Sequence, residues 1–213
     1  AVRACNFGPI RFAGVQHTES SFTLCLFTGG NFDRLDLSGV DFTDSDFSGA
    51  SLRETMLRSA TLVQCNFSEA DLTGADAAAA TAKVANFMGA TLDGANFSGG
   101  DLRFAMFEGA TGTAARFQGT RLDRSLFQDS TFPSTVFVDA KLQYADFSRA
   151  DITNANFEQA DLRSGVLHRA MQNDINGAAW CLADYFGDIG IEYLTMGQHG
   201  HRALAPFDIA TSF

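Results

Sequence analysis

The chain has 213 residues, a net charge of −10 and a pI of about 4.7. Direct binding to nucleic acid is disfavoured, because phosphate contacts need clustered Lys and Arg, whereas a basic protein or one that itself binds DNA is a better partner. The hydrophobic content of 46% disfavours disorder. The sequence has no run of 18 apolar residues, so we expect no membrane-spanning helix.

A five-residue period runs through most of the chain. Counting in fives from position 7 to position 167 gives 33 positions without an insertion or deletion, and Phe, Leu or Ile occupies 29 of them. The residue two places before each central position is almost always small, and the bulky exceptions lie within the first 40 residues: Ile10, Val15, Leu35 and Val40. A period of five fits neither a helix nor a flat strand, so it predicts a solenoid with irregular first coils.

A second period of 20 residues lies within the first. Residues 20 apart are alike, whereas central residues five apart change between Phe and Leu. Four pentapeptides should therefore close one coil, and neighbouring coils should stack like β-strands, about 4.8 Å apart. The regular Phe column is the expected core ladder: Phe47, Phe67, Phe87, Phe107, Phe127 and Phe147.

The unit A-(D/N)-(F/L)-x-x, clearest in Ala145–Leu167, resembles the consensus of the pentapeptide-repeat family. This resemblance covers roughly residues 5–167. It implies an all-β solenoid, a right-handed quadrilateral β-helix of about eight 20-residue coils, with the central and small residues pointing inward. The expected division is a repeat domain over 1–170 and a different C-terminal segment over 171–213.

Two defects interrupt the repeat. Both central positions within Gly74–Ala85 are Ala, and a smaller gap lies at Gly112. The first stretch either bulges out as a loop or short helical turn, or stays in register as a thin coil. If it is a loop, its residues are Ala77, Ala78, Ala79, Ala80 and Lys83.

The C-terminal segment has a different pattern. Ile175–Gly187 predicts a helix of about 10 residues, and Ile189–Leu194 is a short strand-like run. A solenoid end needs a cap, and this segment can supply it. In the Qnr and MfpA types, which the ending resembles, such a helix and run form a tail-to-tail dimer. The implied homodimer residues are Trp180, Leu182, Phe186, Ile189, Ile191 and Leu194.

Catalytic motifs are missing from the sequence. It has no nucleophile elbow, P-loop, HExxH motif or dinucleotide fingerprint, so we expect neither an enzyme nor a cofactor. Nine of the nineteen Asp precede a central residue, and the repeat explains them. Cys5, Cys25 and Cys65 occupy the small position and should be buried thiols of a cytoplasmic protein. His199 and His201 are too weak a signal for a metal site.

An acidic surface is the strongest functional signal. It lies within Asn31–Asp76, and its candidate partner-binding residues are Asp36, Asp41, Asp46, Asp71 and Asp76. The Qnr and MfpA types resemble B-DNA in width and charge and protect type II topoisomerases from poisons. The resemblance therefore implies a non-enzymatic DNA mimic that binds DNA gyrase or topoisomerase IV and gives resistance or immunity to inhibitors such as fluoroquinolones. The alternatives are a scaffold or secreted effector that binds another protein, and an acidic surface without a partner.

Overall fold

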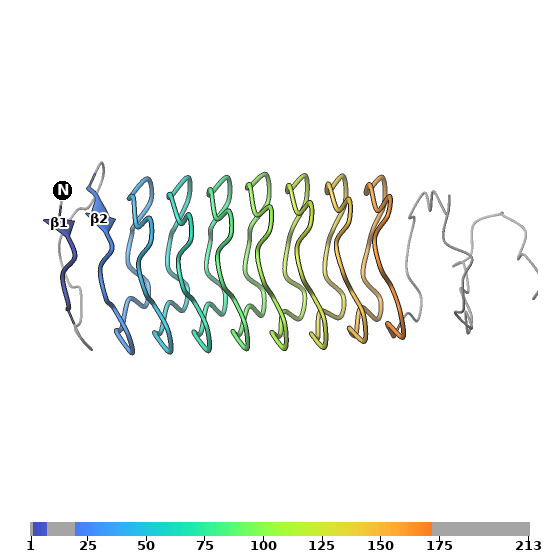
Figure 1. The fold of residues 1–213 in the computed structure, drawn as a ribbon, viewed down its shortest axis with the longest axis horizontal. Helices are drawn as coiled ribbons and strands as arrows, with labels where there is room; N and C mark the ends of the chain where they lie inside the picture. Colours follow the sequence, from blue (N-terminus) through green and yellow to red (C-terminus); the bar gives the residue numbers. More distant parts are fainter. Residues whose placement is uncertain (1, 8–19, 172–213) are drawn as a thin grey trace, which may run out of the picture.

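The structure is a computed structural model that describes residues 2–7 and 20–171. Two short strands, β1 (Val2–Arg3) and β2 (Phe22–Thr23), pair in parallel with Val2 opposite Phe22. The coils that follow are joined by single parallel bridges between residues 20 apart, as far as the bridge from Asp151 to Met171. The coils stack along one axis into a rod (Figure 1). The sequence period of 20 is therefore one coil of the rod.

Each pentapeptide makes one side of the coil and ends in a tight turn. In the pentapeptide centred on Phe47, the N–H of Ala50 donates to the carbonyl of Phe47 at 2.9 Å, and Gly49 has a φ of 61°. Gly49 is the third residue of the four-residue turn Phe47–Ala50. A positive φ at this position is the geometry of a type II turn, which favours Gly. Four such turns close each coil into a quadrilateral.

Two columns of phenylalanine rings fill much of the interior. The six rings of the expected core ladder are all fully buried, and neighbours stack with centroids 5.1 Å apart for Phe47 and Phe67 and 4.6 Å for Phe127 and Phe147. A second column stacks at positions 97, 117, 137 and 157. The two columns meet edge to face, an arrangement that adds to the stabilisation from burial alone.

The stretch Gly74–Ala85 is a thin coil in register, so the expected loop is wrong and the alternative is correct. Parallel bridges join Asp76 to Asn96 and Thr81 to Asp101. The proposed loop residues take their regular places in the coil: Ala77, Ala78, Ala79, Ala80 and Lys83. The physical reason is that backbone hydrogen bonds to the coils on either side hold the register, and these do not depend on side-chain size.

The second defect, Gly at the central position 112, also leaves the coil in register. The space above Gly112 is filled by the ring of Phe132 from the next coil.

The expected C-terminal helix, all six expected dimer residues, His199 and His201 lie outside the described residues. Within the described part of the chain, no helix is long and apolar enough to cross a bilayer.

Candidate interaction surfaces

The rod presents four faces, which we name by the central residue beneath each. Face A lies over Phe47, face B over Leu52, face C over Leu57 and face D over Leu62. Each pentapeptide contributes three outward residues to its face, one before the central residue and two after it. Residues 20 apart therefore form rows that run along one face.

The frequent Asp before the central residue has a structural task. In the pentapeptide Asp46–Ala50, backbone carbonyls accept from four of the five N–H groups. The fifth N–H, that of Ser48, donates to Oδ1 of Asp46 at 2.8 Å. Such a side-chain cap satisfies a donor that the ladder leaves over. The sequence revealed the position of these Asp residues but not this reason for them.

In some pentapeptides the leftover backbone N–H is capped by a carboxylate of the preceding coil. Ser51 and Thr111 occupy the position before the central residue and have no carboxylate. In their pentapeptides Oδ1 of Asp33 accepts the N–H of Arg53 at 3.0 Å, and Oδ1 of Asp93 accepts that of Thr113 at 2.7 Å. A carboxylate one coil away thus replaces the missing local cap.

The five candidate acidic residues do not form one surface. Asp46 lies on face A, Asp71 on face B, Asp36 and Asp76 on face C, and Asp41 on face D. Each accepts the backbone N–H two residues later, at distances between 2.8 and 3.2 Å. Their shared position therefore reflects backbone capping, and their charge is spread around the rod.

Charge nevertheless differs between the faces. Among the described residues, faces A, B and C together carry fourteen carboxylates and six Lys or Arg, whereas face D carries five carboxylates. The remaining seven cationic residues are all on face D: Arg3, Lys83, Arg103, Arg121, Arg124, Lys141 and Arg163. A charge count along the chain misses this contrast, but a count by position within the 20-residue period finds it.

Ion pairs on face D converge on one carboxylate. Asp101 lies 2.8 Å from Nε of Arg103, 3.4 Å from Nζ of Lys83 and 3.7 Å from Nη1 of Arg121. Burial of Asp101 opposes its ionisation, but the hydrogen bonds and charges of Arg103 and Lys83 bring its pKa below the usual value. Three cations thus pair with Asp101, and Asp123 acts on Arg103 as well, so cations outnumber carboxylates around this site.

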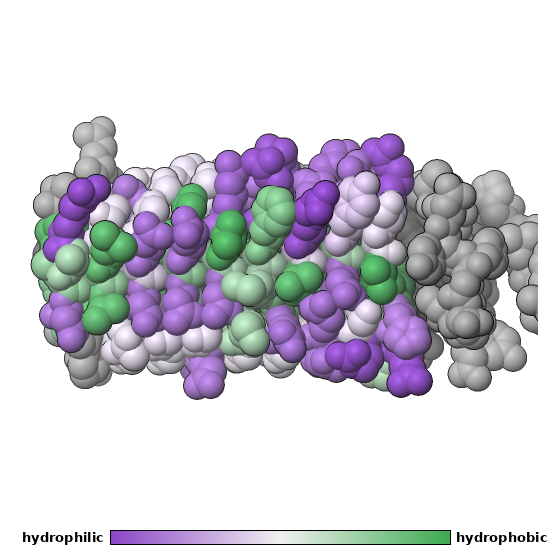
Figure 2. Space-filling model, viewed as in Figure 1, coloured by the Kyte–Doolittle hydropathy of each residue, from purple (hydrophilic) through white to green (hydrophobic). Residues whose placement is uncertain are grey.

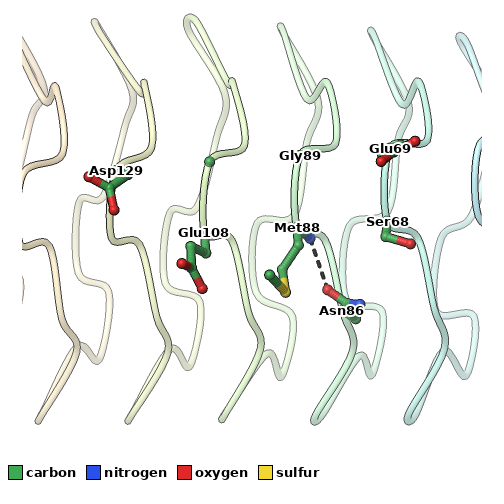
Figure 3. Close-up of a pocket in the computed structure, with 8 residues that line it drawn as sticks. Ser68, Glu69, Asn86, Met88, Gly89, Glu108 and Asp129 are labelled. Carbon is green, nitrogen blue, oxygen red and sulfur yellow. Dashed lines mark hydrogen bonds between the residues drawn. The ribbon is translucent and has the colours of Figure 1, made fainter.

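A shallow depression of about 480 Å³ lies on face A. Figure 3 shows Glu69, Glu108 and Asp129 around it, each from a different coil. Nε of Arg149 contacts Oδ1 of Asp129 at 2.6 Å, so this carboxylate is already paired. Across the described residues, no three His, Cys, Asp or Glu side chains are grouped so that they could hold a metal ion. The depression offers a weakly acidic contact and no pair of nucleophile and base.

The described cysteines are buried or half-buried thiols without a disulfide. Sγ of Cys65 donates to the carbonyl of Phe42 at 3.0 Å. Burial raises the pKa of both Cys25 and Cys65, which keeps the thiols protonated and unreactive. Cys181 lies outside the described residues.

Large apolar side chains gather where face D meets face A. Val84 and Phe104 are neighbours in the last row of face D, and Met106 and Leu126 are neighbours in the first row of face A. We call these four residues the edge patch. Figure 2 shows hydrophobic side chains at several places along the visible face of the rod, among hydrophilic ones.

Comparisons with known proteins match most of the chain. A family model described as "Pentapeptide repeat region" matches residues 15–97, and one described as "Pentapeptide repeats (8 copies)" matches residues 92–129 and 132–169. No curated protein matches the sequence.

Several solved structures are similar to this chain. QnrB1, a plasmid-mediated fluoroquinolone resistance protein, is 19% identical, with 77% of this chain and 90% of that chain covered and a TM-score of 0.45. Rfr23 from the cyanobacterium Cyanothece is 20% identical, with a TM-score of 0.41. The match covers 41% of this chain and spans only 60% of the Rfr23 chain.

Proposed function

Because this chain belongs to the pentapeptide-repeat family, we propose that it is a non-enzymatic binding protein that mimics DNA. In this proposal the rod occupies the DNA-binding cleft of a type II topoisomerase, DNA gyrase or topoisomerase IV, and protects that enzyme from inhibitors. The protein would act in the cytoplasm, where its target works on DNA. It would need no cofactor or metal.

The acidic excess on three faces is the observation that carries this proposal. Fourteen carboxylates lie on faces A, B and C. Residues 20–171 form about 7.5 coils, or roughly 36 Å of rod, so the carboxylates follow at about one per 2.6 Å. Duplex DNA carries about one charge per 1.7 Å of its axis. The six cations on these faces lower the net charge, but the sign and the linear arrangement favour a cleft that binds DNA.

The repeat also supplies rigidity. Backbone hydrogen bonds join each coil to the next along the whole described rod, and stacked rings fill its core. Binding to a partner therefore costs little free energy for ordering the rod, and this favours affinity. Tail-to-tail pairing through the C-terminal segment, whose residues lie outside the described part, would double the length of the mimic.

Gyrase assays test this proposal directly. Purified protein at micromolar concentration should inhibit supercoiling, or restore it in the presence of a fluoroquinolone. Glu108→Lys on face A and Glu158→Lys on face C remove carboxylates for which the structure shows no capping bond, so they should weaken the effect without unfolding the rod. Asp123→Lys on face D is the matched control and should change little. Neither inhibition nor rescue at these concentrations would refute the proposal.

The second candidate is a scaffold or secreted effector that binds a different protein. The cationic and apolar surface of face D favours it, because neither property resembles DNA. Recovery of one stoichiometric partner other than a topoisomerase, together with inactivity in the gyrase assays, would favour this candidate.

A further inference from the structure

Face D differs from the other faces in its backbone chemistry. In every described pentapeptide the second residue after the central one has a positive φ, and on faces A, B and C nine of these residues are Gly. None of the described residues in the corresponding row of face D is Gly: Ala4, Leu24, Asp44, Gln64, Val84, Phe104, Arg124, Tyr144 and Ser164. Face D thus keeps side chains at the positions where Gly is least strained.

Val84 and Phe104 are unfavourable choices at this position, as are the bulky Leu24 and Tyr144 in the same row. The φ values of Val84 and Phe104 are 59° and 63°, and β-branched or bulky residues rarely adopt such angles because the Cβ is crowded. Both side chains are also largely outside the core, with 45% and 49% of their surface exposed. The fold gains little from them, so the strain points to a contact outside the chain.

The repeat does not require apolar residues at the edge patch. Asp44 and Gln64 precede Val84 in the same row, and Asn66 and Asn86 precede Met106 in the neighbouring row. Polar residues thus occupy the same positions of the repeat elsewhere on the rod, so the fold does not need apolar ones there. Exposed apolar clusters of this kind mark interaction sites.

Cations border the edge patch on face D. Lys83, Arg103 and Arg121 all pair with Asp101, and Asp123 is a second carboxylate that acts on Arg103. The guanidinium of Arg124 lies 4.9 Å from the ring centroid of Tyr144. The stacking holds Arg124 against the surface beside the patch. A ligand that covers the patch therefore meets apolar groups and, along one side, four cations that outnumber the two carboxylates Asp101 and Asp123.

We propose that the edge patch and face D form a docking surface for an acidic amphipathic segment of a partner protein. In this arrangement an α-helix, about 10 Å wide, lies along the edge between faces D and A, with apolar residues on the patch and carboxylates toward the cations of face D. A long nucleic acid fits less well, because the neighbouring faces A and C carry an excess of carboxylates. This inference rests on the apolar and cationic side chains of face D and its edge with face A, whereas the proposed function rests on the carboxylates of faces A, B and C.

Fluorescence anisotropy with the full-length chain tests the proposal. The probe is a labelled synthetic helix of about 18 residues, with Leu and Phe on one face and Glu on the other. Reference probes replace Glu by Lys, replace Leu and Phe by Ala, or use single-stranded oligo-dT of equal length. Only the acidic amphipathic peptide should bind, and added salt should weaken it.

Phe104→Gly is the decisive variant. It removes the ring but relieves the backbone, so the unfolding midpoint should stay equal or rise while peptide affinity falls by about tenfold or more. Arg121→Glu should also weaken binding. The matched controls on face C are Met56→Ser, which removes another exposed apolar side chain, and Arg58→Glu. Neither control should change binding.

Several results would overturn the inference. They are an absence of peptide binding at high micromolar concentration, equal binding of the Lys peptide, tighter binding of oligo-dT, and unchanged affinity in Phe104→Gly. The gyrase assays have a different readout, so failure here leaves the proposed function untouched, and the reverse also holds.

Discussion

The ring of Phe132 occupies the place that a side chain at Gly112 would need. A Cβ on Gly112 would stand 2.1 Å from Cε1 and 2.3 Å from Cδ1 of Phe132. The two residues hold the same central position in successive coils, which the bridge from Thr111 to Thr131 joins. The missing side chain in one coil is thus compensated by a large ring in the next.

Gly112→Ala should therefore destabilise the rod although it adds only one methyl group. Overpacking of this kind costs about 1–3 kcal/mol. Phe132→Leu in the same chain should recover part of the loss, because a smaller side chain frees the space. Denaturant unfolding of both single variants and the double variant gives their coupling energy. Additive effects would show that the two positions do not share space.

Phe87→Ala should cost about 3–5 kcal/mol, because it opens a cavity in the middle of the ring stack. Phe87 stacks between Phe67 and Phe107, with centroids 5.1 and 5.0 Å away. Phe104→Ala, only one coil further along, is the matched control, and its ring points outward. The control should shift unfolding by less than about 0.5 kcal/mol. Equal losses in both variants would contradict the assignment of inward and outward positions.

Asp46→Ala should cost about 1 kcal/mol by leaving the N–H of Ser48 without its cap. Asp46 also accepts a hydrogen bond from Nδ2 of Asn66 at 3.1 Å. Asp46→Asn should keep most of the stability, since an amide oxygen can still accept the N–H bond. Glu108→Ala, a non-capping carboxylate on the same face, serves as control in thermal and denaturant unfolding. A loss in Asp46→Asn as large as in Asp46→Ala would mean that charge matters more than capping.

Acid should weaken the rod partly through Asp161. Nε and Nη2 of Arg163 bind its two oxygens at 2.9 and 2.8 Å and hold its pKa well below the usual range. A carboxyl whose pKa is lower in the folded state stabilises it above the unfolded pKa of about 3.9. That contribution is lost as the pH falls toward the folded value.

Arg163→Gln should thus make unfolding less sensitive to pH between about 5 and 2. The effect should be small, since 61% of the Arg163 side chain is exposed and water screens the pair. Parallel unfolding curves of the variant and the parent across this pH range measure it. A steeper pH dependence in the variant would contradict the sign.

Trp180→Ala and Phe186→Ala should convert a homodimer into a monomer. This prediction rests on the sequence pattern, because both residues lie outside the described part of the chain. Size-exclusion chromatography with light scattering measures the mass, and Phe104→Ala controls for a general loss of exposed rings. A parent chain that is already monomeric would contradict tail-to-tail pairing.

The fold could be predicted from the sequence because nearly every central position is occupied by a large apolar residue at a fixed interval. The same reasoning failed at Gly74–Ala85, since it judged the coil by side-chain volume. The N–H of Ala77 donates to the carbonyl of Asn96 at 2.7 Å, and that of Ala82 to Asp101 at 2.8 Å. These bonds exist whatever the side chain, and they keep a thin coil in register.

The candidate surfaces were harder to predict because they depend on rows rather than on neighbours in sequence. Asp36 and Asp41 are close along the chain but lie on different faces, whereas Lys83 and Arg103 are 20 residues apart and share Asp101. The caps and the strained φ of Phe104 are backbone properties. Residue type alone does not reveal them.

The coil of four equal sides also limits how the length of the protein can change. Insertion of one pentapeptide between Val84 and Phe104 would advance every later side chain by a quarter turn and separate these two residues onto different faces. Insertion of 20 residues would lengthen the rod by about 4.8 Å and leave every side chain in its row. A lineage that keeps a function on one face can therefore gain or lose length only in whole turns.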